Sequence, residues 1–243
     1  MGALSRHMLP LALAAVVAQG QRAEPNRIIR VVDPSGRPLV GIDVHWRGAP
    51  GHTKTDSEGL FFPHKNGRFL IGGIRHRPAL VEMTPENPEI EVRLEPAGTG
   101  ETPLPACGRR QRKKWTGTFV MTPVPGGRSE TTCGDHGCVT TQQHPTGGDF
   151  RAGIDSVPPS ISLLPPDSWL RDADFVELRS WRVQGGRGYF VVDLTGRAAD
   201  GSRWRWASSV FDIASYHGAS ERAAKHFDRS IDRMCYREPK QHR

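Results

Sequence analysis

Residues 30–96 alternate short β-branched runs with clusters of Gly, Pro and Asp, and this pattern restricts the segment to a small all-β fold. Apolar alternation begins at Val40 and continues through Ile42, Val44 and Trp46, which predicts a strand with one face in a core. Tight turns are expected at residues 33–36 and 56–59, because Asp, Pro and Gly favour turn conformations.

Three motifs in this segment carry a family resemblance. They read V-x-D-x-x-G-x-P-L-x-G-x-x-V from Val31, T-D-x-x-G-x-F from Thr55 and V-x-L-x-P from Val92. Residues 27–96 thereby resemble the carboxypeptidase regulatory-like domain family, whose members are transthyretin-like β-sandwiches. The resemblance implies a scaffold that occurs beside peptidases, receptors and adhesins, usually without catalytic residues of its own.

Residues 1–18 have the features of a signal peptide. Arg6 and His7 precede an apolar run at residues 8–18 that is too short to cross a bilayer, and small residues follow at cleavage positions. A buried N-terminal helix is the alternative. No later apolar stretch approaches membrane length, so we expect a soluble exported protein, periplasmic or secreted, with no transmembrane segment.

The formal net charge of +7 bears on the partners. In an exported chain it favours solubility, anionic envelope polymers or acidic protein surfaces over nucleic acid, which is not expected as a partner. Residues 97–114 have linker composition and end in a basic run with five positive charges in residues 109–114. We interpret this run as a solvated linker end, with a docking patch for a polyanion as the alternative.

Residues 115–238 are expected to form a second, α+β domain, for which we identify no family resemblance. Strands are predicted at residues 115–121, 175–183, 189–194 and 203–213, with a hairpin at residues 131–141. A C-terminal helix is predicted after Ser220, a good N-cap, because Ala223, Phe227, Ile231 and Cys235 recur every four residues. The fold class is therefore mainly β, with a sandwich followed by an antiparallel sheet and one helix.

A contact surface is considered on the strand at residues 203–213. Trp204 and Trp206 share one face, and Arg203 and Arg205 share the other. Paired Trp side chains serve as core or as a stacking platform for a sugar or a peptide. The core interpretation is favoured because a small domain needs large apolar residues.

All four cysteines belong to the second domain, and four cysteines permit three pairings. Cys133 and Cys138 flank a short hairpin loop, which favours a bridge between them and leaves Cys107 to pair with Cys235. The alternative is a zinc site made by Cys133, Cys138, His136 and His144, but export favours oxidation. No metal or other cofactor is expected.

Sequential catalytic motifs are absent from the chain, including H-x-x-E, H-E-x-x-H and G-x-S-x-G. We therefore expect a non-catalytic binding or accessory protein of the cell envelope, whose partner is a protein or an envelope polysaccharide. An exported inhibitor or immunity protein for a partner enzyme is one alternative. A secreted hydrolase with an unrecognised site in the C-terminal domain is the other, since catalytic groups can converge only in the fold.

Overall fold

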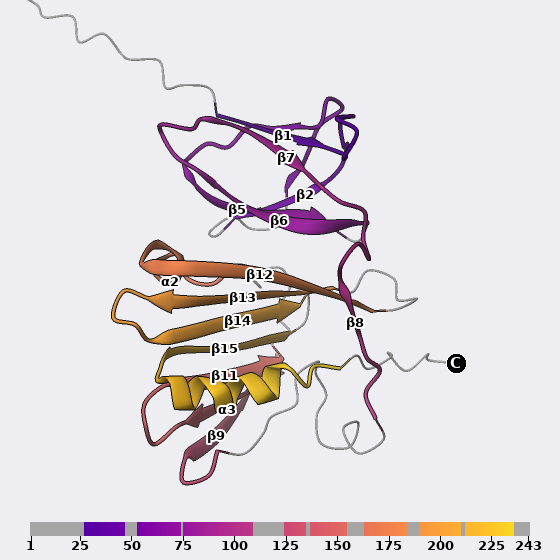
Figure 1. Cartoon of the computed structure of the whole chain (residues 1–243). Coiled ribbons are helices and arrows are strands. Elements are labelled where there is room, and N and C mark those ends of the chain that lie inside the picture. Colours follow the sequence, from indigo (N-terminus) through magenta and orange to yellow (C-terminus); the bar gives the residue numbers. More distant parts are fainter. Residues whose placement is uncertain are drawn as a thin grey trace, which may run out of the picture.

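The computed structural model describes residues 27–46, 53–73, 75–108, 124–134, 137–154, 163–183, 190–209 and 212–235. The expected signal peptide, the basic run and the expected strand at residues 115–121 lie outside these ranges. The described chain is mainly β, as expected, and its strands form two stacked bodies (Figure 1).

The N-terminal body is a sandwich of two sheets. Their strand orders are β4-β1-β7 and β3-β2-β5-β6, and all neighbouring pairs are antiparallel except β1 and β7. The strands are β1 (Ile28–Val32), β2 (Asp43–Trp46), β3 (Thr53–Lys54), β4 (Leu60–Phe61), β5 (Gly67–Gly73), β6 (His76–Met83) and β7 (Glu89–Arg93).

The core of the sandwich lies between these two sheets and contains Ile29, Val31, Val44, Phe69, Ile71 and Val92. The first predicted turn is confirmed, because the Asp33 carboxylate accepts hydrogen bonds from the backbone N–H groups of Ser35 and Arg37. The predicted strand from Val40 to Trp46 is wrong at its start. Gly41 has a φ of 71°, which turns the chain before β2, and Val40 is 62% exposed.

The second body is an eight-stranded sheet with the order β8-β12-β13-β14-β15-β11-β10-β9. All of its neighbouring pairs are antiparallel except β8 and β12. The strands are β8 (Thr102–Leu104), β9 (Arg128–Gly134), β10 (Gly137–Gln143), β11 (Asp149–Ile154), β12 (Ala173–Val183), β13 (Phe190–Ala198), β14 (Arg203–Ser209) and β15 (Asp212–Ala219).

Two sequence expectations differ from the strands that this sheet contains. The single strand predicted at residues 203–213 is wrong, because β14 and β15 pair with each other as a hairpin. The run between them contains no Gly or Pro, so it carries no turn signal. The expected linker also contains a strand, since β8 lies within residues 97–114 and joins the edge of the second sheet.

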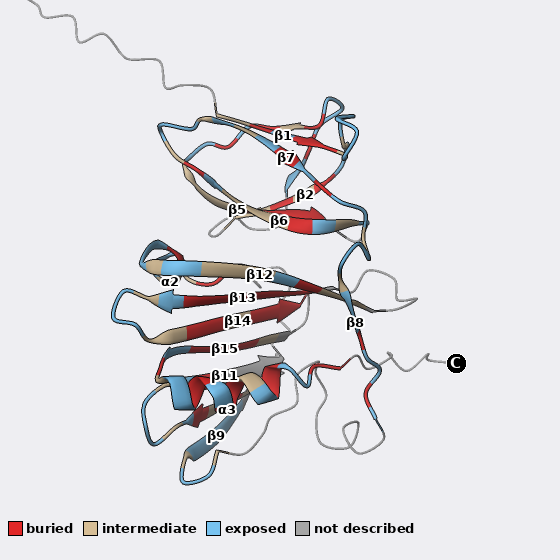
Figure 2. Cartoon of the chain, viewed as in Figure 1, coloured by how far each residue is buried: buried red, intermediate tan, exposed pale blue. Residues whose placement is uncertain are grey.

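Two helices cover opposite faces of this sheet. The predicted C-terminal helix is confirmed as α3 (Glu221–Ile231), and its N-cap Ser220 accepts a hydrogen bond from the backbone N–H of Ala223. Its apolar side packs with Phe150, Ala214 and Tyr216 in one cluster. The short helix α2 (Asp167–Arg171) belongs to the cluster on the other face, which includes Trp204. Figure 2 shows the resulting concentration of buried residues in β13 and β14.

Candidate functional site

The sandwich and the second body meet through an apolar contact. Leu70 on β5 is 1% exposed and packs in the cluster that contains Leu170 and Trp204 of the second body. Its neighbours Phe69 and Ile71 face the opposite way, into the sandwich core. The apolar run of β5 therefore serves two cores, and the two bodies form one packed unit.

A cleft of about 410 Å³ lies between the two bodies. Ligand sites typically enclose about 300–1,000 Å³, so this volume suits a small or short-chain ligand. The second body contributes Asp167, Leu170 and Arg171. The sandwich contributes Trp46, Lys65, Asn66, Gly67, Arg68, Phe69, Glu82, Met83, Thr84 and Pro85.

Trp46 provides an aromatic surface in this cleft. The side chain is half-buried, with its ring centroid 5.6 Å from that of Phe61 and 6.2 Å from that of Phe69. These two buried rings hold the indole in place. The sequence pattern assigned Trp46 to the core, and only part of the residue is there.

The polar groups of the cleft are partly paired with one another. Arg68 contacts Glu82 across the paired strands β5 and β6, with an N–O distance of 3.2 Å. Lys65 and Arg171 are exposed, and neither forms an ion pair with any residue in the described ranges. The cleft thus contains three cations against the two carboxylates of Glu82 and Asp167.

A polar network fixes the chain junction, which is the segment around Glu101 that connects the two bodies, beside this interface. The Glu101 carboxylate accepts hydrogen bonds from the Gly98 backbone N–H at 2.8 Å and from the Ser180 hydroxyl at 2.5 Å. It also pairs with Arg182, and the two side chains are only 2% and 13% exposed. Arg182 in addition donates to the His76 carbonyl on β6. The junction therefore belongs to the folded interface.

His76 is affected by this network. Burial, and then the positive charges of Arg182 and Arg75, lower the pKa of its imidazole below the ordinary value of 6.5. The neutral form of His76 is thus favoured in the folded protein.

The expected contact surface on β14 is not presented to solvent. Trp204 is 0% exposed and Arg205 2%, while Trp206 and Arg203 are half-buried. The prediction that the two Trp residues share one face is confirmed, because both lie in the cluster on the α2 side. The interpretation of Trp204 as core is therefore confirmed.

Arg205 lies on the opposite face and binds three carboxylates. Its N–O distances are 2.7 Å to Asp193, 3.0 Å to Asp228 and 2.9 Å to Asp232. Burial opposes the charged form, but the Asp193 hydrogen bonds and the three negative charges raise the pKa of Arg205 above its usual range. Because Asp228 and Asp232 belong to α3 and its C-cap, this cluster attaches the helix to the sheet.

The predicted bridge between Cys107 and Cys235 is confirmed, with an S–S distance of 1.99 Å. The register of β9 and β10 places Cys133 directly opposite Cys138. The structure describes the backbone of these two residues but not their side chains, and His136 lies outside the described ranges, so the second bridge remains a prediction. Of the alternative zinc ligands, His144 is described, and its Nδ1 lies 2.8 Å from the Thr146 hydroxyl oxygen.

The Thr146 hydroxyl also contacts the hydroxyl of Ser220, which raises the question of whether Ser220 is a nucleophile. The Thr146 oxygen lies 2.9 Å from that of Ser220, which in turn caps α3. A nucleophile needs an oriented base and a substrate cavity. The Ser220 oxygen has instead a helix-capping role, and Ser220 does not line the cleft between the two bodies.

Comparison with known proteins found no match: no family model, no curated protein and no solved structure matches the chain. Within the described ranges, no group of three or more His, Cys, Asp or Glu residues is arranged to hold a metal ion. No helix among the same residues is long and apolar enough to cross a membrane.

Proposed function

We propose that the protein is an exported, non-catalytic binding or accessory protein of the cell envelope, and that the cleft between its two bodies is the contact site. The observation that supports this proposal is the composition of the cleft. An aromatic surface at Trp46 stands beside two cations, Lys65 and Arg171, that have no ion-pair partner in the described chain.

The body that supplies most of the contact residues differs from the sequence expectation. The sequence predicts that the second domain makes the contact and that the sandwich is a scaffold. In the cleft most of the lining residues belong to the sandwich, and Asp167, Leu170 and Arg171 complete it. We therefore propose a site that requires both bodies, on a carboxypeptidase regulatory-like sandwich.

Export is supported by the apolar run after Arg6 and by the disulfide between Cys107 and Cys235, since disulfides persist in oxidising compartments. Mass spectrometry of protein recovered from outside the cytoplasm should give a mature N-terminus at Gln19 or Gln21. Recovery of the intact chain only from the cytoplasm would contradict export.

An exported inhibitor or immunity protein has less support. The large exposed apolar side chains in the described ranges are Val40, Phe62 and Phe175, of which two belong to the sandwich and one to β12 of the second body. A docking surface for an enzyme would be expected to gather such residues in one patch.

The test of the proposed function is co-sedimentation of the purified mature protein with isolated envelope material. Lys65→Trp should weaken binding because the larger side chain occupies the cleft. Lys225→Trp, at an exposed position of α3, is the matched control and should bind as the wild type does. Equal binding by both variants, or no binding by the wild type, would exclude the cleft as the contact site.

A further inference from the structure

We infer that the cleft between the two bodies binds an acidic oligosaccharide, with a sugar ring against Trp46 and a carboxylate between Lys65 and Arg171. This inference rests on the proposed function and specifies the chemical class of its ligand. Three properties of the cleft support it: the aromatic surface, the mixture of hydrogen-bonding groups, and the position of the cations.

The aromatic surface suits the apolar face of a sugar ring. Trp46 has the large, flat π-surface against which C–H groups pack, and its contacts with Phe61 and Phe69 fix the orientation of the indole. A fixed ring loses little conformational entropy when a ligand stacks on it.

The hydrogen-bonding groups around Trp46 are of mixed kind. Asn66 supplies an amide, Thr84 a hydroxyl, Arg68 a guanidinium and Glu82 a carboxylate. Sugar hydroxyls both donate and accept, so they can use all four kinds of group. Asn66 already accepts a bond from Arg27 at 2.9 Å, which orients its amide, and its NH₂ group remains as a donor.

The two cations in the cleft indicate that the ligand carries an acidic group. Lys65 belongs to the sandwich and Arg171 to α2 of the second body, and neither forms an ion pair with a described residue. A carboxylate between them would make charge-assisted hydrogen bonds, which are stronger than neutral ones. The net positive charge of the whole chain, +7, also favours an anionic ligand.

An acidic peptide is the competing occupant. Peptide grooves usually offer a row of apolar pockets for alternate side chains or an apolar channel for a helix. In the cleft, seven charged or polar lining residues outnumber the apolar ones, which are Trp46, Phe69, Met83, Pro85 and Leu170. The saccharide is therefore the better fit, and the peptide enters the test as a probe.

The test is isothermal titration calorimetry with three probes: a tetramer of galacturonic acid, the matching neutral galactose tetramer, and tetraglutamate. We expect the acidic saccharide to bind about tenfold more tightly than the neutral one, and added salt to reduce this difference. Binding of the tetraglutamate should be the weakest. Equal affinity for both saccharides would contradict the claim that the ligand is acidic. Tighter binding of the peptide would contradict the claim that the ligand is a saccharide.

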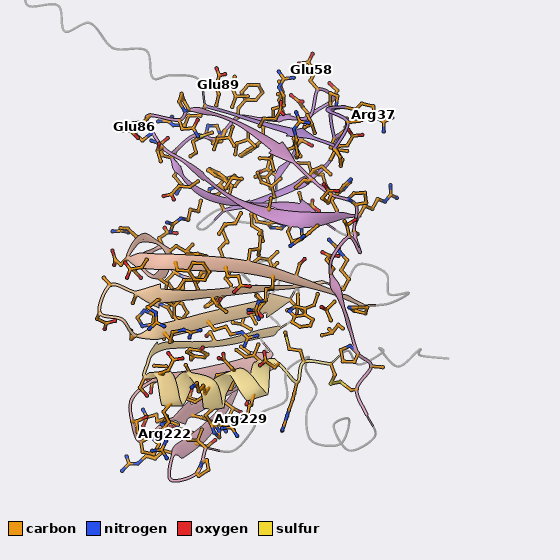
Figure 3. The ribbon with its side chains drawn as sticks, viewed as in Figure 1. Arg37, Glu58, Glu86, Glu89, Arg222 and Arg229 are labelled. Atoms are coloured by element: carbon orange, nitrogen blue, oxygen red, sulfur yellow. A yellow bond between two sulfur atoms is a disulfide. The ribbon has the colours of Figure 1, made fainter. Side chains whose placement is uncertain are left out.

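Charge-reversal variants assign the effect to the cleft. Arg171→Glu and Lys65→Glu should each weaken binding of the acidic saccharide by at least about tenfold and leave binding of the neutral one nearly unchanged. Arg222→Glu, on α3 away from the cleft (Figure 3), makes the same change in net charge and is the control. An equal loss in all three variants would show a general charge effect and overturn the assignment.

The failures of the two proposals can be distinguished. If the protein sediments with envelope material but binds neither saccharide, the inference on the ligand is wrong and the binding function stands. If it binds neither the saccharides nor envelope material, both proposals are wrong.

Discussion

Glu101 and Arg182 form a buried ion pair, with an N–O distance of 2.5 Å, that joins the chain junction to β12. Glu101 lies in a segment whose composition is that of a flexible linker. The pair also brings Arg182 to the His76 carbonyl of the sandwich, so it connects three parts of the molecule.

Removal of one member of this pair should destabilise the protein. Arg182→Met leaves the Glu101 charge buried without its cation, and such a loss costs about 3–5 kcal/mol. The free energy of unfolding in urea measures the effect. Glu91→Gln breaks the exposed pair with Arg93 and should cost less than about 1 kcal/mol. A loss for Arg182→Met no larger than for this control would contradict the role of the junction.

The Arg205 cluster gives a second prediction on stability. Arg205→Met removes the cation from Asp193, which is 0% exposed, and should cost about 3–5 kcal/mol in urea unfolding. The double variant Arg205→Met/Asp193→Asn should recover part of the loss, because the fully buried carboxylate of Asp193 is then no longer left charged without a cation. Asp232→Asn, at a side chain 56% exposed, should have a small effect. No recovery in the double variant would show that packing, and not charge, sets the loss.

The Cys107–Cys235 bridge spans 128 residues of sequence. On the chain-entropy model its loss costs about 5 kcal/mol, whereas a bridge across the β9–β10 hairpin contributes about 2 kcal/mol. Cys107→Ser should therefore lower the midpoint of urea unfolding much more than Cys133→Ser does. Peptide mapping under non-reducing conditions tests the predicted Cys133–Cys138 bridge, and free thiols with stoichiometric zinc would overturn it.

Limited trypsin digestion should cut first in the basic run at residues 109–114. The run follows Cys107, so the N-terminal fragment carries the sandwich, β8 and Cys107. The two fragments should migrate together on a non-reducing gel and separate after reduction, because the disulfide holds them. Separation without reductant, or a first cut within residues 28–94, would be inconsistent with this arrangement.

The lowered pKa of His76 predicts a dependence of stability on pH. The unfolded imidazole takes up a proton near its ordinary pKa of 6.5, whereas the folded one resists protonation until a lower pH. This contribution to stability is complete above about pH 7 and is lost as the pH falls toward the folded pKa. Urea midpoints at pH 7.5 and 5.5 should differ less in His76→Gln than in the wild type. His144 has a pKa shifted in the same direction and will retain part of the slope in that variant.

Local features of the fold could be predicted from the sequence because they depend on nearby residues. The turn at Asp33 and the helix after Ser220 are set by side chains that bond their own backbone. The apolar alternation near Val40 predicts a strand that begins too early, because Gly41 interrupts it with a positive φ. Periodicity alone does not reveal such a break.

The candidate site could not be predicted because it depends on how the two bodies pack. Lys65 and Arg171 are far apart in the sequence, and neither belongs to a motif. The continuous apolar run at Phe69, Leu70 and Ile71 is the one local signal, since it indicates a strand that is covered on both faces. That signal does not say what covers the second face.

The bridge between Cys107 and Cys235 also determines how the protein would carry mechanical tension. The Cα atoms of the two residues are 4.9 Å apart, close to the spacing of about 3.8 Å between consecutive residues. A pull between the sandwich and the residues after Cys235 would therefore pass through the sulfur atoms and bypass β9 to β15. Of the strands in the second sheet, only β8 precedes the bridge and lies in the loaded path. A protein tethered at both ends would keep the chain from β9 to β15 out of the covalent load path until the disulfide was reduced.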